Sequence, residues 1–343
     1  MISSNKKHNG EVMKAKGISR YISIDIVESV LMRMNPKDAM RLSTTCKEWR
    51  VTIPQYDPTM RKTPWFFTIL RSTGSCILRS VVNEDISFEI TLPSYSREQI
   101  FIENVLHGWL VIQDVTISLY NPFSRVRLDL PFAPFSSFYY FYMTSAPMNP
   151  DCIALGHNNE HLFVWRPGDE FWTAEKNVEV KYYKSIVMFQ GELYAIRYSK
   201  ISNRQLVCFQ VAPFQRKDLD VPPPMDLYNN DVYLVESCGE LVLVCIFEAS
   251  KVHLFQLDLK NKAWIKIESL GDQSILLNKR HNKNSGISIS AHATGCLGNC
   301  IYVIDWILVY IYNLENHSII KSDKGLLGYN LMQWIIPTSS CNK

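Results

Sequence analysis

The chain has 343 residues and a mass of 39.7 kDa, with 47% hydrophobic and 12% aromatic residues and a net charge of +3. This length and hydrophobic content predict one large domain with a substantial core and one small domain. The sequence contains neither a basic segment leading into an apolar run at its start nor a stretch of about 20 uncharged apolar residues, so we expect no signal peptide, no membrane span and a location in the cytoplasm, the nucleus or both.

Residues 1–17 are predicted to be a disordered tail, and they begin a basic segment. Residues 1–64 contain 12 Lys+Arg and 6 Asp+Glu, which gives them a charge of +6 and leaves −3 for residues 65–343. The basic residues are scattered rather than aligned with aromatic residues. We therefore interpret them as a solvated surface and expect no nucleic-acid partner.

Residues 18–53 are predicted to form a module of short amphipathic helices. Apolar residues between positions 26 and 34 recur at the spacing of one helical face, and Ser23 is suited to cap that helix. In the next helix Asn35 is a suitable N-cap and Pro36 suits the first helical position. Such short helices cannot bury their own apolar faces, so the module is expected to pack on a partner.

The second half of this module resembles an F-box. The resemblance is carried by Pro36, Asp38, Leu42, Cys46, Lys47, Trp49 and Arg50. An F-box is the helical module through which substrate receptors attach to the Skp-type adaptor of a cullin-based ubiquitin ligase. The residues expected to contact that adaptor are Ile22, Ile26, Val27, Leu31, Met34, Pro36, Met40 and Leu42.

A linker and a long region of strands follow the helical module. Pro54, Pro58 and Pro64 divide residues 54–64 into short pieces, which indicates a domain boundary. Beyond it, runs of Val, Ile, Leu, Phe and Tyr of four to eight residues are bounded by Gly, Asn, Asp and Pro. No helical pattern of ten or more residues separates these runs, so residues 65–343 are predicted to form a mostly antiparallel all-β domain.

The strand region contains an internal repeat. Four segments place a glycine and a polar residue at a tight turn before an outgoing strand: His107–Leu110, Gln190–Tyr194, Cys238–Val242 and Leu297–Tyr302. The unit of strand, glycine turn, strand, polar loop, strand and Asn/Asp turn matches a β-propeller blade. Blades of roughly 40 to 50 residues predict about six of them, with one blade near Asp151–Thr173 lacking its glycine turn. The expected fold class is therefore mostly β, a C-terminal propeller preceded by a small α-helical F-box module.

The propeller region also resembles a known group of proteins. The motifs that carry this resemblance are Asn121–Arg125, Arg166–Thr173, Tyr233–Leu241 and Ser269–Asp272. They are similar to plant F-box proteins whose C-terminal domain is a kelch-like propeller, the group named for suppressed kinking in brassinosteroid mutants. Trp334–Pro337 resembles the closing strand of that domain. The resemblance implies the fold and the role of a substrate receptor.

The sequence does not indicate an enzyme. It contains no GxSxG, HExxH, GxxxxGK[ST] or GxGxxG motif. The acidic pair Asp169-Glu170 follows Pro-Gly and is interpreted as part of a turn, with Phe171 and Trp172 starting a packed strand. The nine cysteines lie mostly in apolar runs and are expected to be buried reduced thiols, so we expect no metal site and no cofactor.

One aromatic cluster allows two interpretations. Its members are Phe132, Phe135, Phe138, Tyr139, Tyr140, Phe141 and Tyr142. A consecutive aromatic run places rings on both faces of a strand, so a core strand is the favoured interpretation and a patch that binds a partner is the other. The loop at 280–286 is basic and polar, and it suits either a disordered excursion or a contact at the rim.

The predicted function is that of a substrate-recognition subunit of a Skp–cullin–F-box ubiquitin ligase, with no bond chemistry of its own. Its expected partners are the Skp-type adaptor, through it a cullin, and a target protein bound by the propeller. An F-box usually opens with Leu-Pro, whereas this chain has Ser23 in place of the proline. This difference favours the alternative, a propeller scaffold or regulator whose degenerate helical cap does not enter a ligase.

Overall fold

The structure is a computed structural model that describes most of the propeller region. The described residues are 63–70, 76–82, 87–90, 92, 101–113, 116–133, 140–158, 161–175, 183–197, 205–211, 214–225, 231–247, 251–279, 285–305, 308–323 and 329–337. The chain divides into two compact units after Pro58, and all described residues belong to the second unit, Thr59–Lys343. The predicted tail, helical module and most of the linker lie outside the described residues.

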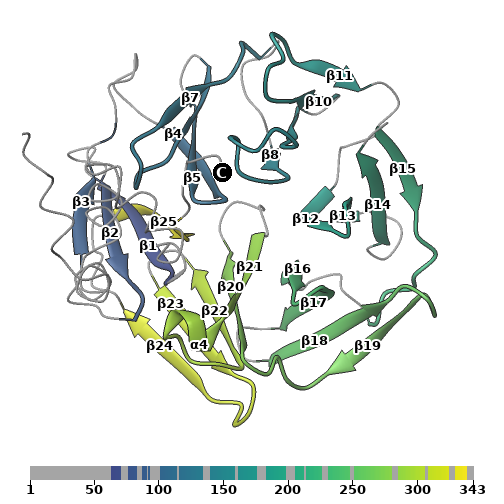
Figure 1. The fold of residues 1–343 in the computed structure, drawn as a ribbon. Helices are drawn as coiled ribbons and strands as arrows, with labels where there is room; N and C mark the ends of the chain where they lie inside the picture. Colours follow the sequence, from purple (N-terminus) through teal and green to yellow (C-terminus); the bar gives the residue numbers. More distant parts are fainter. Residues whose placement is uncertain are drawn as a thin grey trace, which may run out of the picture. The chain divides into compact units, whose positions relative to one another are not determined.

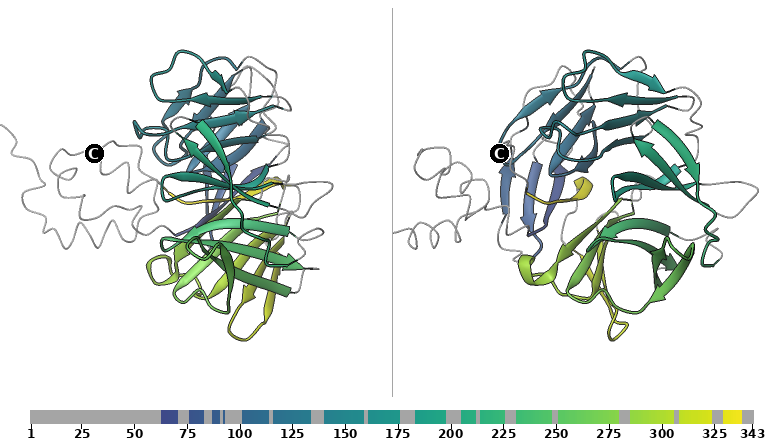
Figure 2. Two further views of the ribbon diagram at one scale, coloured as in Figure 1. Left: turned by 90° about the vertical axis from the view of Figure 1, so that its right-hand side faces the viewer. Right: turned by 45° about the vertical axis from the view of Figure 1, so that its right-hand side comes forward.

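Six β-sheets form the described part of the chain, arranged around a common axis (Figures 1 and 2). We number these sheets as blades 1–6 in the order of their first strands. Blade 1 contains β1 (Trp65–Leu70), β2 (Cys76–Ser80), β3 (Ser87–Ile90) and β25 (Tyr329–Ile335). Blade 2 contains β4 (Phe101–Leu106), β5 (Trp109–Gln113), β6 (Ile117–Tyr120) and β7 (Arg127–Asp129). Blade 3 contains β8 (Tyr140–Met143), β9 (Ala154–His157), β10 (Leu162–Trp165) and β11 (Thr173–Glu175).

The second half of the ring continues the same pattern. Blade 4 contains β12 (Tyr183–Phe189), β13 (Glu192–Arg197), β14 (Gln205–Val211) and β15 (Phe214–Asp218). Blade 5 contains β16 (Asp231–Ser237), β17 (Glu240–Phe247), β18 (Lys251–Asp258) and β19 (Ala263–Ile267). Blade 6 contains β20 (Gln273–Asn278), β21 (Ser285–Ser290), β22 (Cys300–Asp305), β23 (Leu308–Asn313) and β24 (Ile319–Asp323), with helix α4 (Ala291–Thr294) after β21. The predicted mostly β fold and its six blades are confirmed.

Three of the four predicted glycine turns are two-residue hairpin turns. At Cys238-Gly239, between β16 and β17, the φ angles are 53° and 80°. Positive φ at both positions defines a type I′ turn, whose twist matches the flanking strands and which favours glycine. The same pairing of positive φ angles occurs at His107-Gly108 and at Gln190-Gly191.

The fourth glycine, Gly298, is not in a hairpin turn, and this part of the prediction is wrong. β22 pairs in parallel with β20, and the chain reaches β22 from β21 through α4. Parallel strands need a crossover instead of a two-residue turn. Blade 6 therefore has five strands, in the order β21-β20-β22-β23-β24. Blade 3, which spans the predicted blade without a glycine turn, has a longer connection at 144–153 between β8 and β9.

The last strand closes the ring, as the resemblance of Trp334–Pro337 to a closing strand implies. β25 pairs antiparallel with β1, in a register that runs from Trp65 opposite Ile335 to Ile69 opposite Leu331. The indole nitrogen of Trp334 donates a hydrogen bond of 2.8 Å to the carbonyl of Leu277 in blade 6. Its ring also packs on Phe66 of β1, with 4.8 Å between the ring centroids. The two ends of the described chain are thereby joined.

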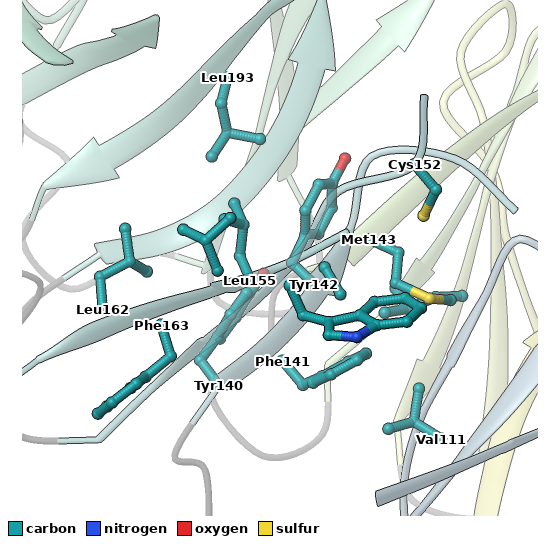
Figure 3. Close-up of a cluster of buried hydrophobic side chains, with 14 of the residues drawn as sticks. Val111, Tyr140, Phe141, Tyr142, Met143, Cys152, Leu155, Leu162, Phe163 and Leu193 are labelled. Atoms are coloured by element: carbon teal, nitrogen blue, oxygen red, sulfur yellow. The ribbon is translucent and has the colours of Figure 1, made fainter. Parts of the chain in front are cut away.

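The core lies between neighbouring blades. Its largest cluster joins blades 2, 3 and 4 and includes Val111 of β5, Phe141 of β8 and Leu193 of β13 (Figure 3). Each of these side chains is at most 2% exposed. Burying such a side chain contributes about 1.5–3 kcal/mol, so the contact between blades is a main source of stability.

Most described cysteines are buried, as the sequence analysis expects, but Cys238 is exposed. All seven described cysteines are free thiols, and Cys76, Cys208 and Cys245 are buried. Burial, helped by the nearby Glu89 carboxylate, raises the pKa of Cys76 to about 12. Helix α4 has four residues, and no helix in the described ranges has the length and hydropathy to cross a bilayer.

Candidate protein-interaction face

The predicted adaptor-binding residues, Ile22 to Leu42, all lie outside the described residues. The candidate site that the structure describes is therefore on the propeller. Two exposed aromatic side chains lead to it, Phe132 after β7 of blade 2 and Phe171 before β11 of blade 3. Their exposed fractions are 67% and 75%, the highest among the large apolar side chains in the described ranges.

Most of the described aromatic cluster belongs to the core. Tyr140, Phe141 and Tyr142 lie in β8 and are buried, as the favoured interpretation predicts. The backbone amide of Met188, in blade 4, donates a hydrogen bond of 3.0 Å to the Tyr142 hydroxyl. Burial raises the pKa of Tyr140 to about 12, although a backbone hydrogen bond with Ile186 opposes the shift. Tyr140 and Tyr142 therefore join blades 3 and 4, and none of the three buried rings is available to a partner.

Phe132 differs from the other described members of the cluster because it is exposed. It lies between the half-buried Pro131 and the buried Ala133 on the connection from blade 2 to blade 3. Phe135, Phe138 and Tyr139 of the same cluster lie outside the described residues. Among the described members of the cluster, Phe132 alone is therefore exposed and able to contact a partner.

The acidic pair Asp169-Glu170 lies in the turn that joins β10 to β11, as predicted. The Asp169 carboxylate accepts a hydrogen bond of 2.9 Å from the backbone amide of Arg166, and the Asp169 amide donates one of 2.9 Å to the Arg166 carbonyl. The indole nitrogen of Trp165 donates a hydrogen bond of 3.0 Å to the Asp169 carbonyl. These three bonds fix the turn and leave the Glu170 side chain exposed.

Phe171 was expected to start a packed strand, and this expectation is wrong. β11 begins two residues later, at Thr173, and of the adjacent rings only Trp172 is buried. Adjacent residues of an extended chain point to opposite faces, so only one of the two rings is able to enter the core. Sequence alone does not identify the buried ring, although the preceding Pro-Gly-Asp turn indicates that the segment lies at the surface.

A hydrogen bond joins the two chain segments that carry the exposed rings. The indole nitrogen of Trp172 donates a hydrogen bond of 3.0 Å to the carbonyl of Pro131. Phe171 and Phe132 are the chain neighbours of these two residues. Trp172 is further held by Phe141, whose ring centroid lies 6.3 Å away. We call Phe132, Phe171, Asp169 and Glu170 the aromatic–acidic surface.

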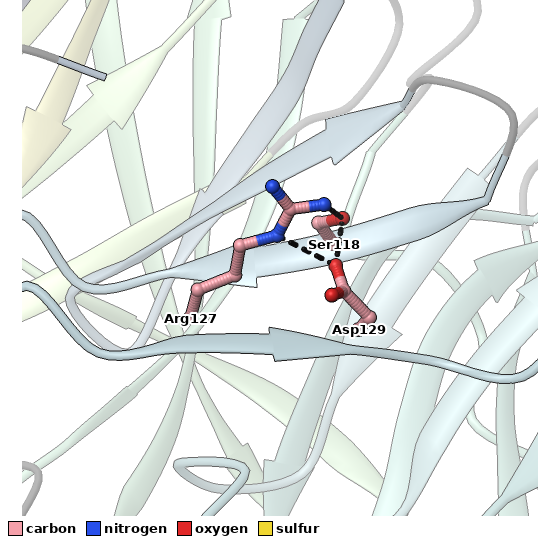
Figure 4. Close-up of polar contacts among 3 residues, drawn as sticks. All are labelled: Ser118, Arg127 and Asp129. Carbon is pink, nitrogen blue, oxygen red and sulfur yellow. Dashed lines mark hydrogen bonds and ion pairs between the residues drawn. The ribbon is translucent and has the colours of Figure 1, made fainter. Parts of the chain in front are cut away.

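A charged group ties the outer strand of blade 2, β7, to its neighbour β6 (Figure 4). The guanidinium of Arg127 lies 2.7 Å from the Asp129 carboxylate, which also accepts a hydrogen bond of 2.6 Å from the Ser118 hydroxyl. Partial burial raises the pKa of the Asp129 carboxyl, but Ser118 and Arg127 lower it more, so its pKa lies below the ordinary value. Asp129 is therefore already paired, unlike Glu170.

A second charged cluster joins blades 5 and 6. The Lys279 ammonium lies 3.2 Å from Asp231 and 3.4 Å from Asp305. Partial burial lowers the pKa of Lys279, but the two carboxylates raise it more, so the net shift is upward. Because the lysine satisfies both carboxylates, we interpret this cluster as a tie between blades. No group of three or more His, Cys, Asp or Glu suited to a metal ion occurs in the described ranges.

The family of the chain follows from its sequence match over the propeller. The KIB1-4 beta-propeller family matches residues 78–330. The chain belongs to the KIB1-4 beta-propeller family. In front of the KIB1-4 propeller, the F-box domain family matches residues 22–56. The predicted family, a plant-type F-box protein with a kelch-like propeller, is thereby confirmed.

Two curated relatives of this KIB1-4 protein come from Arabidopsis thaliana. F-box/kelch-repeat protein At1g57790 is 23% identical over 333 residues, which cover 91% of this chain and 89% of the relative. F-box protein At1g49360 is 25% identical over 324 residues, which cover 87% of this chain and 63% of the relative. Among solved structures, TolB from Acinetobacter baumannii is 10% identical with a TM-score of 0.47, over 79% of this chain and 66% of that chain.

Proposed function

We propose that this protein is a substrate-recognition subunit of a Skp–cullin–F-box ubiquitin ligase. The observation that carries the proposal is the F-box match at residues 22–56 in front of a KIB1-4 propeller on one chain. F-box domains generally bind Skp-type adaptors. In this assignment the module at 18–53 docks on the adaptor, residues 54–64 are a linker, and the propeller holds the target protein in the cytoplasm or the nucleus.

The surface of the propeller suits it to bind a target protein. The propeller core is packed with aliphatic and aromatic side chains, and its outer face carries charged strands and the aromatic–acidic surface. Such a face recognises a macromolecule by shape and charge. In this proposal the chain acts only as a receptor for the target protein, and other subunits of the ligase transfer ubiquitin.

Adaptor capture tests the proposal. Each aliphatic residue that the adaptor covers contributes about 1.5–3 kcal/mol before the cost of association is subtracted. Replacing Ile26 and Leu31 together with aspartate is therefore expected to abolish capture of the full chain by a purified Skp-type adaptor. The matched control is Ile320→Asp, which makes the same change at a half-exposed position of β24 and is expected to leave capture unchanged. Capture of the double variant at the wild-type level would contradict the docking assignment.

The alternative function is a propeller scaffold that enters no ligase. It is favoured by Ser23 in place of the usual proline. Under this alternative the wild-type chain binds no Skp-type adaptor, and Ser23→Pro does not restore binding. Under the proposed function the wild-type chain binds, and Ser23→Pro binds at least as tightly.

A further inference from the structure

The aromatic–acidic surface presents apolar area that the fold does not use. Phe132 and Phe171 are 67% and 75% exposed, whereas most large apolar side chains in the described ranges are buried. Scattered exposed apolar residues are normal, but here two phenyl rings flank one hydrogen bond across two blades. Phe132 and Phe171 are chain neighbours of the two residues that this bond joins, so the backbone segments that carry the rings lie close together.

Both rings stand on rigid supports. Phe171 precedes Trp172, which is 8% exposed and packs against Phe141 and Trp165. Three hydrogen bonds fix the turn before it. Phe132 follows Pro131, whose carbonyl accepts the bond from Trp172. A partner that covers these rings therefore pays little to order the backbone that carries them, which favours binding.

The charges on this surface select the partner. Asp169 and Glu170 are exposed beside Phe171, and neither forms an ion pair with a basic side chain in the described part of the chain. The face of a phenyl ring attracts a cation, and a carboxylate forms strong hydrogen bonds with a guanidinium. The planar guanidinium satisfies both demands at once, because it stacks on rings and donates in a fork, whereas a lysine ammonium does not stack.

We propose that the aromatic–acidic surface binds an arginine-bearing peptide segment of the target protein. The inference rests on the proposed function, since it names the class of target segment that the propeller receives. The arginine side chain lies against Phe171 and donates to Glu170, and an apolar neighbour in the same segment covers Phe132. Arginine identity and the two rings together give the specificity.

Binding of defined peptides to the full chain tests this proposal. The probes are fluorescein-labelled octapeptide libraries with arginine, lysine or citrulline fixed at position 4 and the other positions randomised. Citrulline has the shape of arginine without its charge. The arginine library is expected to yield peptides whose fluorescence anisotropy rises with protein, and their citrulline counterparts are expected to bind at least about tenfold more weakly.

Variants of the surface locate the binding. Phe171→Ala and Phe132→Ala are each expected to weaken the selected arginine peptide by about tenfold, and Glu170→Gln by about threefold to tenfold. The matched controls are Ile265→Ala on β19 and Glu315→Gln in the turn after β23, both exposed and on other blades, and these are expected to leave affinity unchanged. Thermal unfolding of each variant shows that the fold is kept.

Four outcomes would overturn the proposal. They are the absence of any arginine peptide that binds below millimolar concentration, equal affinity for arginine and citrulline, full affinity in Phe171→Ala, and a wild-type protein that dimerises through this surface. Measuring adaptor capture of Phe171→Ala distinguishes a failure of the peptide-binding proposal from a failure of the proposed ligase function. If Phe171→Ala loses peptide binding but is still captured by the adaptor, the surface is the target site of a ligase subunit. If the wild-type chain binds the peptide but is not captured by the adaptor, the surface belongs to a scaffold outside a ligase.

Discussion

At the residue scale, Ser118 sets the environment of the charged pair on β7. Its hydroxyl is fully buried and donates to the Asp129 carboxylate, so the pair Arg127–Asp129 is tied to the neighbouring strand β6. In a similar pair on β15, Arg216–Asp218, the residue opposite Asp218 is Val207, whose side chain offers no hydroxyl to that carboxylate. Comparing the two pairs therefore distinguishes the contribution of a surface ion pair to stability from the added contribution of a buried hydroxyl.

This difference predicts a stability effect that depends on pH. Asp129→Asn is expected to lower the free energy of unfolding by about 1 kcal/mol at pH 7, and Asp218→Asn by less than about 0.5 kcal/mol. The pKa of Asp129 is lowered in the folded state, so its stabilisation is present above the unfolded pKa of about 3.9 and is lost as the pH falls through the lower folded pKa. Urea unfolding followed by tryptophan fluorescence at pH 7 and pH 3 measures this effect. A difference for Asp129→Asn that is as large at pH 3 as at pH 7 would contradict the account.

At the scale of the element, β21 depends on a close approach to blade 5. A Cβ atom added at Gly286 would lie 2.4 Å from a methyl group of Val235 and 2.8 Å from one of Leu277. Both neighbours are buried, with exposed fractions of at most 1%. Since neither side chain is free to move away, only glycine, which has no Cβ atom, fits at position 286.

Gly286→Ala is therefore expected to destabilise the propeller. Overpacking of a buried contact costs about 1–3 kcal/mol, which corresponds to a fall in Tm of about 2–4 °C for each kcal/mol in a domain of this size. The matched control is Gly298→Ala, whose added Cβ would meet Ala291 at an ordinary 3.4 Å and is expected to change Tm by less than about 2 °C. Differential scanning calorimetry compares the two variants, and equal Tm values for them would contradict the close packing of β21.

At the scale of the whole molecule, stability depends on the closure of the ring by β25. Met332, Trp334 and Ile335 are all at most 4% exposed, and their burial contributes about 5–9 kcal/mol in total. The entire stability of a domain is about 5–15 kcal/mol. A chain that ends at residue 328 is therefore expected to lose cooperative unfolding, whereas a chain that ends at Pro337 keeps it. Urea titrations monitored by circular dichroism test this, and a normal transition in the shorter chain would show that closure is dispensable.

The sequence predicts those features that depend on local patterns. Strand runs and the glycine of each type I′ turn are recognisable because propensity, turn chemistry and periodicity coincide, whereas the closing strand was expected from the family resemblance alone. Gly298 was misinterpreted because its local pattern is that of a hairpin, while the parallel pairing of β20 with β22 is a long-range choice. The exposure of Phe171 was missed for a similar reason, because a packing contact at Trp172 decides which ring is buried. The adaptor-binding residues stay predictions.

The antiparallel pairing of β1 with β25 also fixes the order of events during synthesis. Ribosomes deliver the residues from the N-terminus onward, so the edge of β1 that receives β25 stays unpaired until nearly all of the polypeptide has emerged. Nascent chains consequently carry the F-box segment well before they have a complete ring. A premature stop codon ahead of the codons for β25 would leave that segment attached to a domain with an open sheet edge, a form prone to aggregation.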